Sequence, residues 1–345
     1  MTRQITVGGI SIGGGAPVVI QSMLNTKTTD VAGSLRQLNA LKTAGCQIAR
    51  LAVPNMEAAR AFSEICKESP MPLVADIHFD YRLAIAAAEG GASKIRINPG
   101  NIGGADRVAA VVDVCKDRKI PIRIGVNGGS LDKRLLEKYG HPTAEALVES
   151  AFEHLELLEK CSFYDTCVSM KSSTVPTMVA AARLFRSKCD YPIHIGVTET
   201  GPVRMGLMKS AMGIGALLLD GIGDTIRVSL TDDPVEEVYA AKDILKAAGL
   251  LKEGVNIISC PTCGRTQINL IDLVNQVDVA LKDCKKPITV AVMGCVVNGP
   301  GEAREADIGI AGGDGCGMLF EKGQQVEKVP YDELLPALLK RIEKL

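Results

Sequence analysis

The strongest constraint on the fold of this chain is a pattern that repeats eight times between residues 18 and 250. A short β-branched run is followed by a turn and then by a segment whose apolar residues recur at spacings of three and four. These patterns are typical of buried strands and of amphipathic helices. The predicted strands are Val18–Met23, Gln47–Val53, Leu73–Phe79, Lys94–Asn98, Pro121–Asn127, Thr166–Lys171, Pro192–Thr198 and Thr225–Leu230. The predicted helices are Asp30–Ala44, Met56–Lys67, Arg82–Glu89, Asp106–Lys119, Thr143–Lys160, Pro176–Lys188, Val203–Leu219 and Pro234–Ala248.

Eight strand–helix units in succession predict a (β/α)8 TIM barrel over residues 1–250. A doubly wound open sheet would more often have fewer strands, and no Gly-x-Gly-x-x-Gly turn follows the first strand. Ile5–Ile10, with its neighbouring glycines, predicts a hairpin that closes the barrel floor.

The pattern changes after Gly249, where we expect a separate small α/β domain over residues 251–345. Its predicted strands are Val255–Ser259, Ile288–Met293, Ile308–Ala311 and Met318–Glu321, and its predicted helices are Asn269–Asp283 and Tyr331–Leu345.

Three cysteines and one glutamate in this small domain are spaced like the ligands of a metal centre. Cys260 and Cys263 form a Cys-x-x-Cys pair, Cys295 follows the next predicted strand, and a glycine-rich stretch then contains Glu302. A four-thiolate zinc site would need a second Cys-x-x-Cys, which the chain lacks. Three cysteines on a cubane leave the fourth iron free of thiolate, and Glu302 could bind there as an exchangeable oxygen ligand. From spacing alone, structural zinc and unligated thiols remain alternatives.

Composition narrows the classes of partner. The net charge of −1 argues against a general nucleic-acid or membrane-surface partner, and no apolar run is long enough to span a bilayer. The N-terminus lacks the apolar stretch of a secretion signal, so we expect a cytoplasmic protein. Eleven cysteines in such a protein indicate metal ligands or buried thiols rather than disulfides. We expect the following to be small buried apolar residues: Cys46, Cys66, Cys115, Cys161, Cys167 and Cys189.

Cations occur in five of the predicted strands, each flanked by apolar residues: Arg50, Arg96, Arg123, Lys171 and Arg227. The active site of a TIM barrel lies at the carboxyl ends of its strands. Strand alternation places Arg96 with Asn98, Arg123 with Asn127, and Arg227 with Ser229 on shared faces. Several cations that converge in a nearly neutral protein predict a strongly anionic ligand, and guanidinium groups suit phosphate oxygens.

Three ionisable residues accompany these cations, namely Asp76, His78 and Glu199. A carboxylate among so many cations stays ionised, so Glu199 could hold a hydroxyl group or pass a proton. His78 is either a core histidine bonded to Asp76 or a residue that acts on the substrate. We expect His141, His154 and His194 to be structural or exposed.

Together these features resemble the 4-hydroxy-3-methylbut-2-enyl diphosphate synthase family (IspG, also called GcpE), of the two-domain bacterial type, essentially from end to end. The stretches that carry the resemblance are Gln21–Met23, Ala75–Phe79, Arg96–Asn101, Thr198–Gly201, Ser259–Arg265 and Met293–Glu302. The last two are highly specific.

The resemblance implies a [4Fe–4S] cluster held by Cys260, Cys263, Cys295 and Glu302. It implies a barrel that binds 2-C-methyl-D-erythritol 2,4-cyclodiphosphate through the five cations, with hydrogen bonds from Asn98, Asn127, Thr198 and Ser229. It further implies a homodimer, in which the cluster domain of one subunit caps the partner's barrel, and a flavodoxin or ferredoxin as electron donor.

The expected reaction is a two-electron reductive dehydroxylation with ring opening in the methylerythritol phosphate pathway of isoprenoid biosynthesis. Glu199, Glu302 and His78 are the expected catalytic residues. Two alternatives remain at this point: a lyase of the aconitase type that needs no electrons, and a cluster carrier or iron sensor that leaves the cations of the barrel unexplained.

Overall fold

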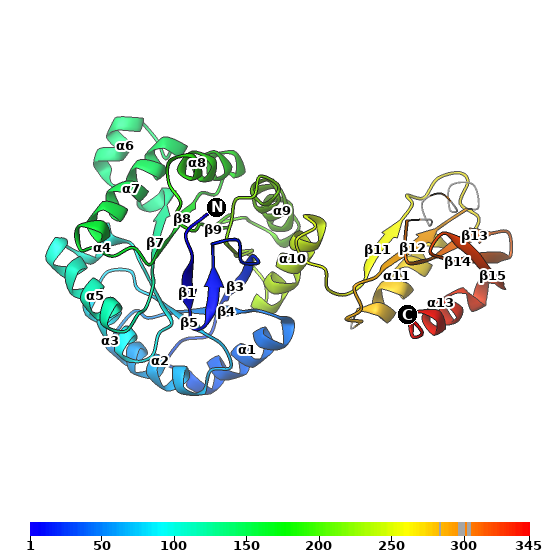
Figure 1. Ribbon diagram of the computed structural model, residues 1–345, viewed down its shortest axis with the longest axis horizontal. Helices are drawn as coiled ribbons and strands as arrows, with labels where there is room; N and C mark the ends of the chain where they lie inside the picture. Colours follow the sequence, from blue (N-terminus) through cyan, green and yellow to red (C-terminus); the bar gives the residue numbers. More distant parts are fainter. Residues whose placement is uncertain (283, 296–300, 302–304) are drawn as a thin grey trace. The chain divides into compact units, whose positions relative to one another are not determined.

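The computed structural model describes residues 1–282, 284–295, 301 and 305–345. The described chain separates into two compact units, residues 1–250 and 251–345 (Figure 1). The first unit is a parallel eight-stranded barrel surrounded by helices, and the second is a small α/β domain. The expected architecture is therefore confirmed.

The barrel is a closed ring of parallel strands. Strands β3 to β8 pair in chain order, and β10 pairs with both β3 and β9. A parallel bridge between Val168 and Ile193 joins β8 to the segment that enters β9, which closes the ring. The strands are β3 (Val19–Met23), β4 (Ile48–Ala52), β5 (Leu73–Asp76), β6 (Lys94–Ile97), β7 (Ile122–Asn127), β8 (Thr166–Lys171), β9 (His194–Ile195) and β10 (Thr225–Ile226). Because all of them run in one direction, their carboxyl ends share one rim.

The helices that follow the strands cover the outside of the barrel (Figure 1). They are α1 (Val31–Ala44), α2 (Met56–Glu68), α3 (Tyr81–Glu89), α5 (Ala105–Asp117), α7 (Ala144–Lys160), α8 (Val175–Lys188), α9 (Val203–Leu219) and α10 (Pro234–Ala247). The side chains of Asp30, Asn55 and Thr143 accept hydrogen bonds from first-turn N–H groups of α1, α2 and α7, which fixes where these helices begin. None of the described helices combines the length and the apolarity needed to cross a membrane.

Three short elements of the barrel were not predicted from the sequence. They are α4 (Pro99–Ile102), η1 (Gly128–Ser130) and α6 (Lys133–Tyr139), which follow β6 and β7. None exceeds seven residues, so each contains too few turns to show a helical period.

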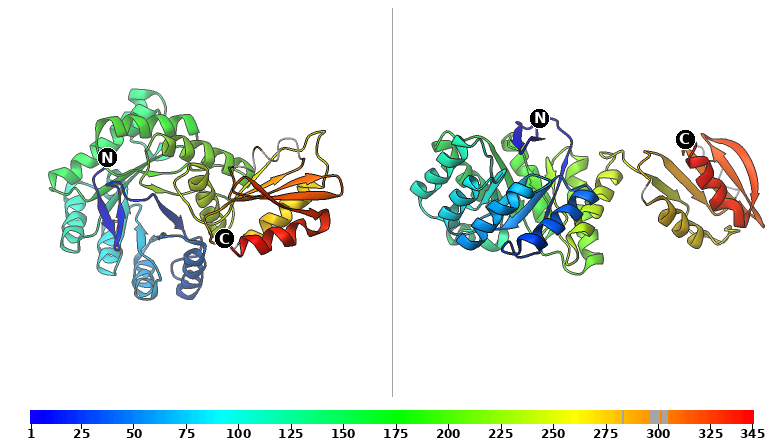
Figure 2. Two further views of the ribbon diagram at one scale, coloured as in Figure 1. Left: turned by 45° about the vertical axis from the view of Figure 1, so that its right-hand side comes forward. Right: turned by 90° about the horizontal axis from the view of Figure 1, so that it is seen from below.

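A hairpin closes the amino-terminal end of the barrel, as expected. Its strands β1 (Ile5–Val7) and β2 (Ile10–Ile12) are antiparallel and joined by Gly8 and Gly9, both at positive φ. The two further views show the hairpin at one end of the barrel (Figure 2). Its apolar side chains pack on residues of four barrel strands, namely Val19, Ile48, Val74 and Cys167. The hairpin therefore covers this end of the barrel interior.

The described part of the small domain is a five-stranded mixed sheet, with helices α11 and α13 packed on one face. The strand order follows the chain: β11 (Asn256–Ser259), β12 (Thr289–Met293), β13 (Ile308–Gly313), β14 (Cys316–Glu321) and β15 (Gln324–Pro330). The helices are α11 (Leu270–Leu281) and α13 (Leu334–Ile342), the latter preceded by η2 (Tyr331–Glu333). Leu273, Val277 and Leu338 of these helices share one core with Val290 and Ile310 of the sheet. Strand β15 was not predicted, because most of its side chains are exposed and lack an apolar alternation.

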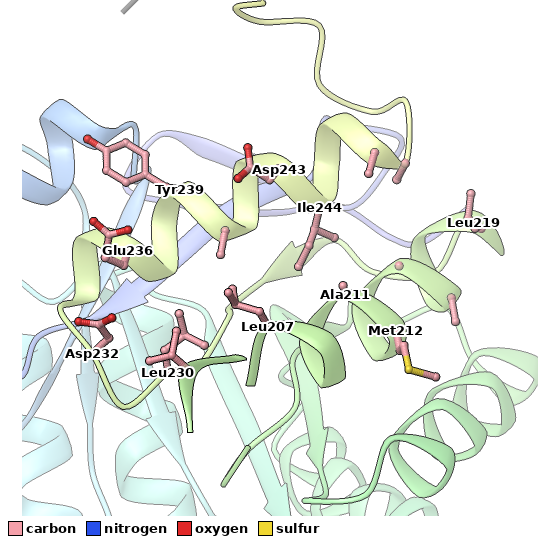
Figure 3. A pocket seen from close by; sticks show the side chains of 16 residues that line it. Leu207, Ala211, Met212, Leu219, Leu230, Asp232, Glu236, Tyr239, Asp243 and Ile244 are labelled. Carbon is pink, nitrogen blue, oxygen red and sulfur yellow. The ribbon is translucent and has the colours of Figure 1, made fainter. Parts of the chain in front are cut away.

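A groove of about 760 Å³ lies on the outer face of the barrel between α9 and α10 (Figure 3). Leu207 and Met212 line it, while Asp232 and Glu236 lie at one end. Met212 and Leu219 are 67% and 76% exposed. Both side chains belong to α9 and line the groove, and apolar side chains this exposed are typical of a protein contact surface.

Candidate active site

The five predicted cations lie in the interior of the barrel. Arg50, Arg96, Arg123 and Lys171 belong to β4, β6, β7 and β8, and Arg227 follows β10 directly. Arg123 is only 1% exposed, and Arg50, Arg96 and Lys171 are also buried. Strand alternation turns these residues inward, because the intervening residues pack against the surrounding helices.

The cations interact with one another. Burial lowers the pKa of Lys171 well below its ordinary value, and repulsion from all four arginines lowers it further. The pKa of Arg50 is lowered in the same way, although the carboxylate of Asp76 opposes this shift. Burial also lowers the pKa of Arg123 to about 10. Mutual effects of this kind require the five charged groups to converge on one region of the barrel.

Asp76 supplies a carboxylate to this region. Its Oδ1 accepts a hydrogen bond from Arg96 Nη1 at 3.0 Å, and its Oδ2 lies 3.7 Å from Arg50 Nε. Burial alone would raise the pKa of Asp76, but Arg50, His78 and Arg96 hold it well below its ordinary value. Asp76 alone cannot balance five cations, so this region keeps an excess of positive charge.

Several buried donors in this region have no acceptor in the part of the chain that the structure describes. They are Arg96 Nε, Arg123 Nε, Arg123 Nη1 and Ser229 Oγ. A buried polar group without a partner costs roughly 1–3 kcal/mol, and a charged group costs more. The arrangement therefore suits a ligand that brings several negatively charged oxygen atoms.

Two glycines allow close packing of neighbouring groups inside the barrel. A Cβ at Gly125 would lie 2.4 Å from Arg96 Nε, and a Cβ at Gly196 would lie 2.3 Å from the carbonyl oxygen of Arg227. Glycine is thus required where the Arg96 guanidinium and the backbone of Arg227 approach neighbouring strands closely.

The remaining predicted residues lie at the rim. Asn98 is buried, and its side chain accepts a hydrogen bond from Gly100 N at 3.2 Å, which starts α4. Asn127 ends β7, and Thr198 lies beyond β9, partly buried. Glu199 is exposed and has a φ of 53°, in the left-handed region that few non-glycine residues adopt.

His78 lies beyond β5, with its Nε2 3.4 Å from Asp76 Oδ2. Its side chain is 51% exposed. The interpretation of His78 as a core histidine is therefore wrong, although the expected contact with Asp76 is present.

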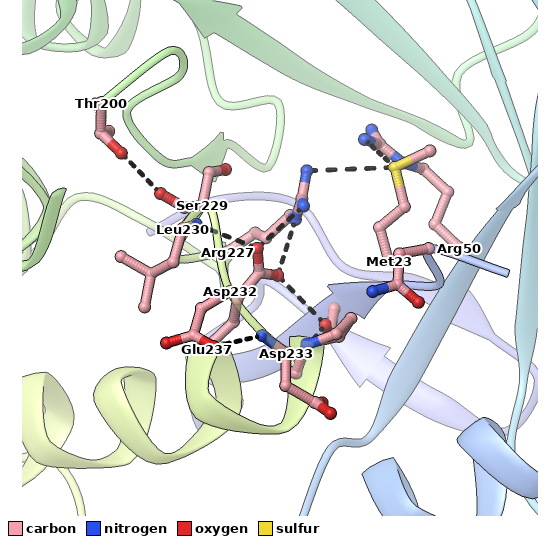
Figure 4. A network of polar contacts seen from close by, with 12 residues as sticks. Met23, Arg50, Thr200, Arg227, Ser229, Leu230, Asp232, Asp233 and Glu237 are labelled. Carbon is pink, nitrogen blue, oxygen red and sulfur yellow. Dashed lines mark hydrogen bonds and ion pairs between the residues drawn. The ribbon is translucent and has the colours of Figure 1, made fainter. Parts of the chain in front are cut away.

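No sequence pattern predicts the network that surrounds Arg227 (Figure 4). Glu237 of α10 accepts hydrogen bonds from Arg227 Nη2 at 3.1 Å and from Arg227 Nε at 3.3 Å. The Sδ of Met23 lies 2.7 Å from Arg50 Nη2 and 4.0 Å from Arg227 Nη1. A glutamate in the first turn of an outer helix has the pattern of a solvated residue, and a methionine in a strand has the pattern of a core residue.

A polar layer lies beneath the cations, within the closed part of the barrel. Lys94 Nζ donates to Gln21 Oε1 at 3.3 Å, and His194 Nδ1 lies 2.7 Å from Thr225 Oγ1. Burial lowers the pKa of Lys94 to about 8. His194, which we expected to be structural or exposed, is 1% exposed, and burial lowers its pKa well below the ordinary value.

The predicted metal ligands belong to the small domain. Cys260 and Cys263 follow β11, and Cys295 follows its parallel neighbour β12, so all three leave the sheet at one edge. The Gly294 N–H lies 3.3 Å from Cys260 Sγ. The side chain of Arg265 is hydrogen-bonded to the Cys263 thiol, and this bond raises the pKa of Arg265. Electrostatic interaction with Cys295 and Cys260 raises that pKa further.

Backbone and side-chain hydrogen bonds from Arg265 also lower the pKa of Cys263. Over the described residues, no group of three histidine, cysteine or carboxylate side chains has the geometry of a metal site. Glu302 lies outside the described residues. Three sulfur donors at one sheet edge, with one of them shifted toward the thiolate, nevertheless have the chemistry that an iron–sulfur cluster requires.

Two protein-family models match this chain. The GcpE TIM-barrel domain matches residues 2–242, and the GcpE protein C-terminal domain matches residues 256–344. The 4-hydroxy-3-methylbut-2-en-1-yl diphosphate synthase (flavodoxin) of Clostridium perfringens is 58% identical over 342 residues, which cover 99% of this chain and 98% of the relative. The protein of the same name from Geobacter sulfurreducens is 56% identical over 344 residues, with 100% and 98% covered.

Solved structures with similar folds are more distant. A truncated 3-deoxy-D-arabino-heptulosonate 7-phosphate synthase from Thermotoga maritima has a TM-score of 0.50 and 15% identity, and the similarity covers 72% of this chain and 94% of that one. The N-acetylneuraminic acid synthetase of Leptospira borgpetersenii also has a TM-score of 0.50 and 15% identity, with 82% and 99% covered. These similarities indicate a shared fold alone.

The buried ammonium of Lys94 generates a prediction about pH. Its pKa is about 8 in the folded protein against 10.5 for the ordinary group. Between these values the unfolded chain binds a proton that the folded chain has released, so the free energy of unfolding rises with pH. Lys94→Met should remove this contribution, so that wild type gains about 3 kcal/mol relative to the variant between pH 7 and pH 10. Urea unfolding of both proteins across this range measures the difference, and parallel pH profiles would contradict the assignment.

Proposed function

The chain belongs to the GcpE family, and we propose that it converts 2-C-methyl-D-erythritol 2,4-cyclodiphosphate into (E)-4-hydroxy-3-methylbut-2-enyl diphosphate, in the methylerythritol phosphate pathway. The reaction opens the ring, consumes two electrons and two protons, and releases one water. The observation that carries this proposal is the convergence of five cations with unsatisfied buried donors in a barrel whose interior a hairpin covers at one end.

The cations and the polar rim residues would bind the diphosphate. In the part of the chain that the structure describes, guanidinium donors of Arg96 and Arg123 and the hydroxyl group of Ser229 have no hydrogen-bond partner. Phosphoryl oxygens would accept from them in pairs, and Arg50, Lys171 and Arg227 would balance the charge. We propose the same role for the polar groups of Asn98, Asn127 and Thr198, which follow or end three different strands. An anion at this position would also restore the lowered pKa of Lys171, because it favours the charged form.

Glu199 and His78 lie where they could act on the organic part of the ligand. Both are exposed at the rim, beyond β9 and β5, outside the layer of buried cations. We propose that Glu199 orients or protonates the reacting hydroxyl group. We propose that His78, whose Nε2 faces Asp76, is a second proton-bearing group there.

Cys260, Cys263, Cys295 and Glu302 would hold a [4Fe–4S] cluster. When bound, this cluster supplies single-electron transfer and an iron atom that can bind an oxygen atom of the substrate. The support for it is the donor set and the place of its three cysteines at the end of two neighbouring strands. The barrel residues contribute binding and orientation, and they keep the diphosphate away from bulk water.

The proposed partners follow from the family. Flavodoxin appears in the name of the Clostridium perfringens relative, and we propose flavodoxin, or else a ferredoxin, as the electron donor in the cytoplasm. We also propose a homodimer in which the cluster domain of one subunit caps the partner's barrel. The apolar groove between α9 and α10 supports contact with a second copy of the chain.

Anaerobic turnover tests the proposed reaction. Protein reconstituted with iron and sulfide should form the allylic diphosphate from the cyclic diphosphate only when a reduced electron donor is present. Arg123→Met should lower kcat/KM at least about a hundredfold, since it removes a charged and otherwise unpartnered donor worth roughly 3 kcal/mol.

Arg183→Met is the matched control, because Arg183 pairs with Asp220 at the surface of the barrel, and its kcat/KM should equal that of wild type. Cluster-loaded protein that forms no allylic diphosphate would contradict the proposal. Turnover without an electron donor would favour the lyase instead.

The dimer surface can be tested separately. Met212→Glu places a charge on the exposed apolar face of α9 and should raise the dimer dissociation constant at least about tenfold, because a carboxylate is costly to bury. Sedimentation velocity over a dilution series measures this constant. Met56→Glu, at an exposed methionine of α2, should leave it unchanged, and an unchanged dimer in Met212→Glu would place the contact elsewhere.

A further inference from the structure

We propose that Glu237 is a positioning residue, which orients the Arg227 guanidinium so that one of its nitrogens faces the ligand. The inference rests on the proposed function of the barrel as a diphosphate-binding site. It concerns a residue of an outer helix that the sequence pattern does not distinguish from its solvated neighbours.

Glu237 is held in place by four donors. Besides Nη2 and Nε of Arg227, its Oε1 accepts from Leu230 N at 3.1 Å and its Oε2 accepts from Ser22 Oγ at 3.2 Å. The residue is 4% exposed. The N-cap of α10 places it there, because Asp233 accepts from Val235 N at 2.9 Å and fixes where the helix starts. A carboxylate with four donors from three directions has little freedom to move.

The consequence is a guanidinium that is bound along one edge. Nε and Nη2 of Arg227 are occupied by Glu237, whereas Nη1 points toward Met23 Sδ, 4.0 Å away (Figure 4). The same sulfur receives Nε and Nη2 of Arg50 at 3.1 and 2.7 Å. An uncharged thioether therefore lies between two like-charged groups, and among the described residues Nη1 of Arg227 has only this weak acceptor. Nη1 is accordingly available to a stronger acceptor on a ligand.

An ordinary structural ion pair would stabilise the protein without affecting ligand affinity. Arg183 and Asp220 form such a pair at the surface, as do Arg3 and Asp190. The Arg227–Glu237 pair differs because its cation also contributes to the lowered pKa of Lys171 and of Arg50, the other buried cations of the site. Glu237 thus neutralises part of the positive charge along the Nε–Nη2 edge of Arg227 and leaves Nη1 available to the ligand.

The test compares Glu237→Gln with wild type in holoenzyme turnover. The amide retains one accepting oxygen but loses the charge, so KM for the cyclic diphosphate should rise about tenfold while kcat changes less than about threefold. In an Arg227→Met background the same substitution should change KM less than about twofold, because Glu237 acts through Arg227. Ser22→Ala removes one donor to Glu237 and leaves the ion pair intact, so it serves as the control, with KM expected within about twofold of wild type.

Calorimetric titration of inorganic pyrophosphate into the full chain separates this inference from the proposed function. If wild type fails to turn over the cyclic diphosphate, the proposed function fails. A tenfold weaker affinity of Glu237→Gln for pyrophosphate would then still support the inference. Equal pyrophosphate affinity in wild type and Glu237→Gln would overturn the inference. The inference would also be overturned if Glu237→Gln lowered the pyrophosphate affinity equally in the Arg227→Met background and in wild type. Absence of pyrophosphate binding by wild type would overturn it as well.

Discussion

Five cations lie together inside the barrel, and the surrounding structure compensates only part of their charge. Arg123 is fully enclosed, and two of its nitrogens lack an acceptor among the residues described. Lys171 is buried among four arginines. Removing a charge from water is costly unless a partner compensates it. The folded protein carries part of this cost uncompensated, and a multiply charged anion is the ligand that relieves it.

The remainder of the barrel makes this charge tolerable. The hairpin of β1 and β2 covers one end of the barrel interior with apolar side chains. Asp76 compensates Arg50 and Arg96 from within, whereas Glu237 compensates Arg227 from an outer helix. Gly125 leaves the space into which the Arg96 guanidinium extends. These features hold the cationic side chains in place around one region of the barrel.

The sequence predicts the barrel well, because eight strand–helix repeats leave few alternatives and strand alternation alone turns Arg96 and Arg123 inward. It does not predict β15, whose side chains are mostly exposed. It also misses Glu237 and Met23, since their roles depend on contacts between residues distant in the chain.

The burial of Lys94 could have been suspected from its place two residues before Arg96 on the same strand face, but the sequence does not show what encloses it. For the small domain, spacing identifies Cys260, Cys263 and Cys295, and the order of β11 and β12 explains why these residues leave one edge of the sheet.

A diphosphate that compensates the buried cations must change their protonation, so proton linkage is the decisive measurement. The cyclic diphosphate should be titrated into the full chain by calorimetry at a series of pH values, in buffers of different ionisation enthalpy. We predict saturable binding with one ligand per chain and a net uptake of protons, because the ligand raises the lowered pKa of Lys171. Binding without proton uptake, or no binding at all, would contradict the account.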